Sequence, residues 1–139
     1  MTSESTPTAS PPKTSLVLTI VTWVGRAISL LCVAALSMSG ILKIQQPQWL
    51  LDDFAKFKYP EGVLFPIGIA ELVGVVLYAI PQTSVLGAIW LTGYLGGAVA
   101  THVHAGDGDF AGPIILGVLV WLGLVLRDPK LRAILPWRF

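Results

Sequence analysis

Residues 16–42 read LVLTIVTWVGRAISLLCVAALSMSGIL, and Arg26 is the only charged residue in this run. An α-helix needs about 20 mostly apolar residues to cross the hydrocarbon core of a bilayer. The run is longer than that, and it is also longer than the apolar segment of about 7–15 residues that is typical of a signal peptide. It therefore predicts a retained transmembrane helix.

Three further apolar runs follow, at residues 63–80, 85–101 and 113–126. Each is near the length that spans a membrane, although the last is somewhat short. Proline, glycine and polar residues separate the runs, and these residue types commonly end helices. The expected fold is therefore all-α, a four-helix transmembrane bundle.

The composition indicates that lipid solvates much of the surface. Of the 139 residues, 54% are hydrophobic and only 12% are charged, and the mean hydropathy is +0.74. Soluble domains carry about 25% charged residues. The formal net charge of +1 gives no argument for binding nucleic acid, and a single cysteine excludes an intrachain disulfide.

The length permits one domain, which we place at residues 16–128. Residues 1–15 are rich in serine, threonine and proline and are expected to be disordered. Residues 129–139 are expected to form a C-terminal tail in the cytoplasm.

Residues 49–57 predict a short amphipathic helix between the first two spans. Leu50, Phe54 and Phe57 recur at helical spacing, whereas charged residues such as Asp53 face away. Two interpretations are open. The helix lies in the membrane interface, or it is a loop helix packed on the mouth of the bundle.

The distribution of lysine and arginine predicts the orientation in the membrane. The side formed by the two tails and the second turn carries five such residues: Lys13, Arg127, Lys130, Arg132 and Arg138. The opposite side carries three: Lys43, Lys56 and Lys58. Arg26, near the inner end of the first run, strengthens this bias. We therefore expect a multi-pass protein of the cell membrane with both ends in the cytoplasm.

Glu71 is the clearest exception to the apolar pattern, because it falls near the middle of the second span. A charge at that depth is costly, so such residues face the interior of a bundle and commonly mark function. Its neighbours at helical spacing are Gly68, Gly74 and Tyr78. This face is expected to turn inward. There Glu71 either binds a ligand, a proton or a quinone headgroup, or belongs to a hydrogen-bond network that fixes helix register.

The third and first runs carry matching polar faces. In the third run these residues are Trp90, Gly93, Tyr94, Gly97, Thr101 and His104. In the first run they are Arg26, Ser29, Cys32, Ser39 and Lys43. The pattern Gly93-x-x-x-Gly97 is expected to permit close approach of two helix backbones.

The candidate ligand-binding or proton-binding residues are Glu71, Lys43, Tyr94, His102 and Arg26. Tyr94 matches Glu71 in depth and is the easier hydrogen-bond partner. Lys43 lies at the outer mouth, so its side chain would have to reach inward. No residue is proposed as catalytic.

The end of the third run contains residue types that bind metals: His102, His104, Asp107 and Asp109. Their spacing matches no closed zinc motif. Histidines near a helix C-terminus are favoured by the helix dipole, and glycine commonly follows the last turn. We therefore expect helix capping here, with no metal ion and no cofactor.

Four motifs in chain order resemble those of the DoxX-like membrane proteins. They are Ser39-Gly-Ile-Leu-Lys43, Phe57-Lys-Tyr-Pro-Glu61, GIAELVG at 68–74, and GYLGGAVATH at 93–102 followed by Gly106-Asp107. No single motif is specific, but the ordered set is. In one departure, Phe57-Lys58 stands where the family has Leu-Gly, which is expected to alter only the turn.

The resemblance implies a four-helix membrane protein. The family name derives from subunits linked to quinol oxidation and thiosulfate–quinone chemistry, and some relatives are associated with oxidative-stress complexes. We expect a non-catalytic subunit or a small-ligand-binding protein, with quinone or lipid as ligand. The expected partners are membrane lipid and, as open alternatives, a membrane redox protein or a second copy of the chain.

Two other functions stay open. One is a small proton-coupled transporter that uses Glu71, and the other is a structural scaffold without a ligand. An open cavity at Glu71 would favour a ligand, whereas a closed and packed core would favour a scaffold.

Overall fold

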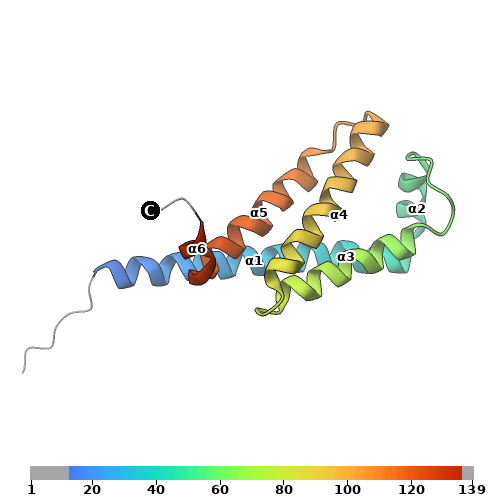
Figure 1. Cartoon of the computed structure of the whole chain (residues 1–139). Coiled ribbons are helices and arrows are strands. Elements are labelled where there is room, and N and C mark those ends of the chain that lie inside the picture. The colour runs from blue at the N-terminus through green and yellow to red at the C-terminus, as the bar shows by residue number, and fades with distance from the viewer. Residues whose placement is uncertain (1–12, 136–139) are drawn as a thin grey trace, which may run out of the picture.

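The computed structural model describes residues 13–135, and their regular structure is entirely helical (Figure 1). The elements are α1 (Lys13–Gln45), α2 (Gln48–Ala55), α3 (Leu64–Ala79), α4 (Ser84–Ala105), α5 (Ala111–Arg127) and α6 (Pro129–Ile134). The all-α prediction is confirmed for this part of the chain. Of the two expected tails, residues 1–12 and 136–139 lie outside the described residues. The rest of each tail is largely helical, in the start of α1 and in α6.

Local sequence explains where several helices begin and end. Gly106 follows α4 with a φ of 70°, in the left-handed region that glycine adopts without steric cost. Asp128 precedes α6, and its carboxylate accepts hydrogen bonds from the backbone N–H groups of Lys130 and Leu131. Pro129 occupies the first turn of α6, where a missing N–H costs nothing.

The four long helices form a ring, in which α1 and α4 each pack against both α3 and α5. In Figure 1, α1 and α3 run side by side, while α4 and α5 rise from them at an angle. The two pairs are therefore close together at the end near α6 and diverge toward the end where α2 lies (Figure 1).

Glycines allow close contact at the end near α6. A Cβ atom on Gly25 of α1 would come within 2.5 Å of the backbone nitrogen of Arg127. A Cβ atom on Gly87 of α4 would come within 2.2 Å of the backbone nitrogen of Tyr78 in α3. Real Cβ atoms do not approach this closely, so glycine at both positions is what allows these helix backbones to touch.

A buried tyrosine connects three helices at the same end. The Tyr78 side chain is completely buried. Its hydroxyl lies 3.0 Å from Ser29 Oγ in α1 and donates a hydrogen bond of 2.8 Å to the carbonyl oxygen of Val120 in α5. The hydroxyl thus accepts one hydrogen bond and donates another, so this buried polar group has no unpaired atom.

The outward surfaces of the helices are apolar. Leu30 and Leu31 of α1 are 74% and 71% exposed, and Val118 of α5 is also largely exposed. Soluble monomers rarely expose such extended apolar surface. α1 and α4 are long and apolar enough to cross a membrane, whereas α3 and α5 are apolar but shorter. These features indicate a membrane protein, and the crossing of the bilayer by all four helices stays a prediction.

Candidate functional site

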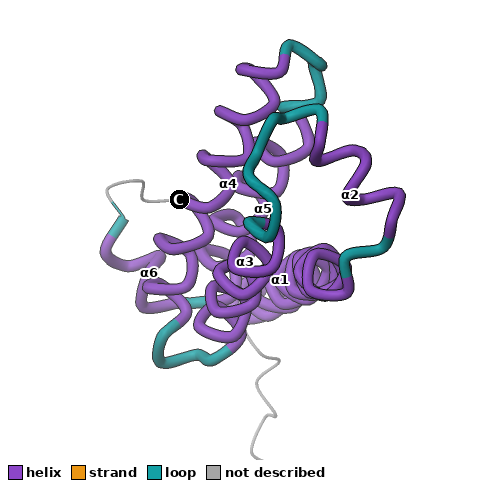
Figure 2. Tube along the Cα trace, turned by 90° about the vertical axis from the view of Figure 1, so that its right-hand side faces the viewer, coloured by secondary structure: helices purple, strands orange, loops and turns teal. Residues whose placement is uncertain are grey.

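A cavity of about 760 Å³ lies where the two helix pairs diverge. Figure 2 views the molecule from this end and shows α2 standing apart from α4 and α5. Residues of α1, α2, α3, α4 and α5 line the cavity, and its apolar lining includes Leu36, Leu95 and Leu116. Glu71 therefore lies at an open cavity and not inside a fully packed core.

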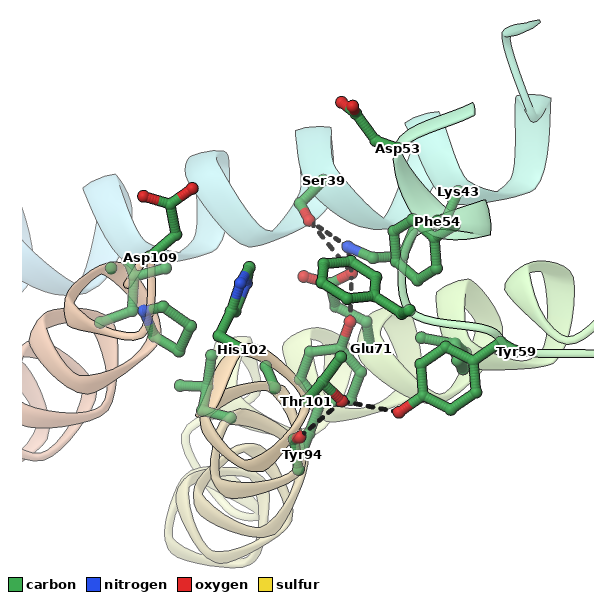
Figure 3. Close-up of a pocket in the computed structure, with 18 of the residues that line it drawn as sticks. Ser39, Lys43, Asp53, Phe54, Tyr59, Glu71, Tyr94, Thr101, His102 and Asp109 are labelled. Carbon is green, nitrogen blue, oxygen red and sulfur yellow. Dashed lines mark hydrogen bonds and ion pairs between the residues drawn. The ribbon is translucent and has the colours of Figure 1, made fainter. Parts of the chain in front are cut away.

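Glu71 is the centre of a hydrogen-bond network in the cavity wall (Figure 3). Its Oε2 accepts hydrogen bonds from Lys43 Nζ at 2.9 Å, Tyr94 Oη at 3.0 Å and Ser39 Oγ at 3.3 Å. Lys43 Nζ also donates to Ser39 Oγ. A buried carboxylate is costly unless it is paired and hydrogen-bonded, and here both conditions are met.

Three helices position this network. Ser39 and Lys43 lie four residues apart on α1 and therefore share one face of it. Glu71 comes from α3 and Tyr94 from α4. α1 and α3 approach closely beside them, since a Cβ atom on Gly68 would lie 2.9 Å from a backbone carbonyl oxygen of α1. The closeness of the two helices explains how Lys43 reaches inward to the carboxylate.

The inward face of the second apolar run is confirmed. Gly68, Glu71, Gly74 and Tyr78 are all buried in α3. Tyr94 and Lys43 are both brought to Glu71. Their role in binding a ligand or a proton stays a prediction.

Arg26 lies apart from the Glu71 network and does not line the cavity. Its side chain is exposed, and its guanidinium lies 4.9 Å from the centre of the Trp23 ring. Arg26 and Lys43 are separated by about 25 Å along α1 at 1.5 Å per residue. The two residues share a stripe of α1 but lie at opposite ends of the part of α1 that packs in the bundle.

His102 lines the cavity from the last turns of α4. Its Nδ1 lies 2.8 Å from Asp107 Oδ2, and its ring meets the Phe57 ring edge to face at 5.3 Å between centroids. The backbone N–H of Asp109 and the His102 ring hold the pKa of the Asp107 carboxyl below its usual value. His102 is thus held at the cavity rim, whereas His104 is exposed.

Within residues 13–135, no group of three or more His, Cys, Asp or Glu side chains comes together in a way that could hold a metal ion. The histidines and aspartates after α4 instead form the His102–Asp107 pair and the turn beside it. The expected absence of a bound metal and of a cofactor stays a prediction.

The amphipathic helix α2 and the turn after it contribute apolar side chains to the cavity, and both interpretations of the helix, interfacial or at the bundle mouth, stay open. Leu50, Phe54 and Phe57 all line the cavity. After α2, the hydroxyl of Tyr59 lies 2.6 Å from Thr101 Oγ1 on α4, which joins the α2 segment to the opposite wall (Figure 3). This contact escaped the sequence analysis because it depends on the turn that follows α2.

Two further expectations about this region are wrong. Gly93 and Gly97 do not mediate helix packing, because a Cβ atom on either would meet nothing within 4 Å. They line the cavity instead, since α4 has diverged from its neighbours at this depth. Asp53 was expected to face away from the apolar side of its helix, but it also lines the cavity, at the exposed rim.

The departure from the family pattern falls in the turn after α2. Lys58 has a φ of 56°, in the left-handed region that favours glycine. A glycine in the family pattern at this place is consistent with that backbone conformation. In this chain, Lys58 adopts the same left-handed conformation, which has a steric cost for a residue with a Cβ atom.

Comparison with known proteins agrees with these features. Residues 27–123 match the family model described as the DoxX-like family, and this range contains the whole Glu71 network and His102. No curated protein and no solved structure matches the chain. Because the match covers more than half of its length, the chain belongs to the DoxX-like family.

Proposed function

We propose that this chain is a non-catalytic, four-helix membrane protein that binds a small amphiphile, a quinone or a lipid, in the cavity beside Glu71. The observation that carries the proposal is the cavity of about 760 Å³ with a buried ion pair in its wall. Ligand pockets typically enclose about 300–1,000 Å³ and combine an apolar lining with a few placed polar groups. A scaffold without a ligand has no need for this space.

The surface of the two shorter helices supports four membrane crossings. α3 has 16 residues and α5 has 17, which corresponds to about 24–26 Å at 1.5 Å per residue. This is slightly less than the hydrocarbon core of about 30 Å, a mismatch that a bilayer accommodates by thinning. Phe65 and Val76 of α3 and Ile115 of α5 are exposed apolar residues facing outward.

The proposed topology places the cavity near the outer membrane surface. The lysine and arginine distribution assigns both ends of the chain to the cytoplasm, so α2 and the turn between α4 and α5 lie outside. The cavity opens among these segments. A ligand with an apolar body therefore reaches Glu71 from the outer half of the bilayer.

The chemistry of the lining favours an amphiphile. Leucines and aromatic side chains provide apolar surface in the wall, and the Lys43–Glu71 pair provides a polar point inside it. Quinones and lipids both combine an apolar body with a small polar head. The link of the family name to quinol chemistry makes quinone the first ligand class to test.

The test is mass spectrometry of small molecules that co-purify with the full chain in mild detergent. Gly97→Leu places a side chain in the cavity, because Gly97 lines it and a Cβ atom there meets nothing within 4 Å. Gly96→Leu is the matched control, since Gly96 is equally open but does not line the cavity.

We expect a stoichiometric quinone or lipid with the unchanged chain and with Gly96→Leu, and its loss with Gly97→Leu. Equal retention by both variants would show that the molecule binds elsewhere. Absence of any stoichiometric amphiphile from the unchanged chain, in detergent and in extracted lipid discs alike, would contradict the proposal.

A further inference from the structure

The two oxygens of Glu71 have different surroundings. All three hydrogen bonds of the carboxylate fall on Oε2. Among the described residues, none donates a hydrogen bond to Oε1. In Figure 3 the second oxygen points away from the three donors, toward the side of the cavity where His102 lies. The side chain is only 2% exposed, but Oε1 itself is not fully buried, and Glu71 lines the cavity.

Lys43 has a complementary property. An ammonium group has three N–H donors, and Lys43 Nζ uses two of them, on Ser39 Oγ and on Glu71 Oε2. In the described part of the chain, the third donor has no partner. Lys43 also lines the cavity, and its side chain is 13% exposed. This one ion pair therefore carries an acceptor and a donor that no described residue engages.

We infer that the cavity selects molecules whose polar head is a hydroxyl group, as in a phenol, a quinol or an alcohol with an apolar body. This inference rests on the proposed ligand-binding function and names the ligand chemistry of the same site. A hydroxyl donates to Glu71 Oε1 and accepts from Lys43 Nζ at the same time. Ethers, esters and the carbonyls of an oxidised quinone only accept, so they leave the carboxylate oxygen unpaired.

The charge of the site favours a neutral head. Glu71 and Lys43 compensate each other at 2.9 Å, so neither an anion nor a cation finds an unbalanced partner at this pair. The other charged lining residues, such as Asp109, are exposed. A buried acceptor left without a hydrogen bond carries a desolvation penalty. The site therefore discriminates between a hydroxyl and its methyl ether more strongly than between two apolar bodies.

Isothermal titration calorimetry of the full chain in lipid discs tests this inference, with empty discs as the reference. The probes are para-hexylphenol, its methyl ether para-hexylanisole, and para-hexylcyclohexanol. We expect the phenol to bind at least about tenfold more tightly than the ether, the factor that corresponds to the loss of one hydrogen bond to a charged group.

The measurement with para-hexylcyclohexanol distinguishes a ligand with an aliphatic hydroxyl from one with an aromatic hydroxyl. Affinity equal to that of the phenol indicates an aliphatic alcohol, such as that of a lipid. Weaker affinity than the phenol, but tighter than the ether, indicates an aromatic head such as a quinol. Both results support the shared chemistry.

Glu71→Gln inverts the prediction. The three donors hold the amide oxygen at the position of Oε2, which turns the amide NH₂ toward the cavity. The cavity-facing atom then donates, so we expect the ether to bind as tightly as the phenol or more tightly. Asp52→Asn removes the same charge from an exposed position outside the cavity and is expected to keep the preference for the phenol.

Equal or tighter binding of the ether by the unchanged chain would overturn the inference and leave the proposed function standing. Failure of all three probes to bind would also overturn the inference, whereas the proposed function is decided by whether a stoichiometric amphiphile co-purifies with the chain. If Glu71→Gln lacks a cooperative melt, the comparison of the three probes on the unchanged chain decides by itself. An unchanged preference in folded Glu71→Gln would assign the discrimination to another group and contradict the role of Oε1.

Discussion

Removal of the Lys43 amine is expected to destabilise the protein strongly, because it leaves Glu71 charged and nearly buried. In Lys43→Met, the carboxylate keeps only the donors Ser39 and Tyr94, and with 2% of its side chain exposed it gains little solvation from water. Breaking a buried ion pair costs about 3–5 kcal/mol. Because two donors remain, we expect the free energy of unfolding to fall by about 3 kcal/mol, at the lower end of that range. This corresponds to a fall in Tm of about 6–12 °C.

A double-mutant cycle isolates the pair from other effects of the substitutions. Lys43→Met combined with Glu71→Leu removes both charges, so the double variant is expected to lose much less stability than the sum of the two single variants. Coupling energies of contacting residues reach about 3 kcal/mol. The assay is thermal unfolding of the full chain in one detergent, followed by circular dichroism.

The matched control is Lys56→Met, which removes the lysine of an ion pair whose side chains are 73% and 54% exposed. Exposed pairs contribute about 0–1 kcal/mol, so its Tm is expected to change little. Strictly additive losses for Lys43→Met and Glu71→Leu, or equal losses for Lys43→Met and Lys56→Met, would refute the reasoning.

Three other measurements test separate parts of the structure. Gly87→Ala is expected to lower the free energy of unfolding by about 1–3 kcal/mol through overpacking, because its Cβ would meet the Tyr78 backbone at 2.2 Å. The control Gly96→Ala meets open space and is expected to be neutral or stabilising in the same thermal unfolding assay. Reporter fusions are expected to place the C-terminus in the cytoplasm and the turn between α4 and α5 outside, and an external signal from the C-terminus would contradict the topology. The lowered pKa of Asp107 means that its stabilising effect is complete above the unfolded value of about 3.9 and is lost as pH falls through the folded value. The difference in Tm between the unchanged chain and Asp107→Asn is therefore expected to shrink as the pH falls below about 4; a difference that persists at the most acidic pH would contradict this assignment.

The helices and the inward face of α3 could be predicted from the sequence. Apolar runs interrupted by proline and glycine mark helices because lipid leaves backbone polar groups no other partners. Glu71 with Gly68, Gly74 and Tyr78 at helical spacing defined one face, because the geometry of a single helix places residues three, four and seven apart together. The inward direction followed from the cost of exposing a carboxylate to lipid.

The partners of Glu71 were only partly predictable. Tyr94 matched it in depth, which the sequence shows, but whether Lys43 reaches inward depends on how closely α1 and α3 pack. Arg26 lies on the same polar stripe of α1 and still points elsewhere. A polar face of a helix limits the direction in which a side chain points. It does not show which neighbouring helix lies opposite that side chain at a given position along the helix.

By itself the sequence determined the four long helices and α2, their order, the membrane-protein class and the inward position of one charged residue, since each of these depends on residues close together in the chain. The sequence analysis missed α6, which lies in the expected C-terminal tail. Only the tertiary structure decided that the helix pairs diverge, that Gly93 and Gly97 line open space, and that Glu71 keeps one oxygen free at a cavity. Those features depend on the angle between helices, and that angle results from contacts such as Gly25 with α5 and Gly87 with α3 at the opposite end of the molecule. Close packing at one end of the bundle is the physical reason for the space at the other.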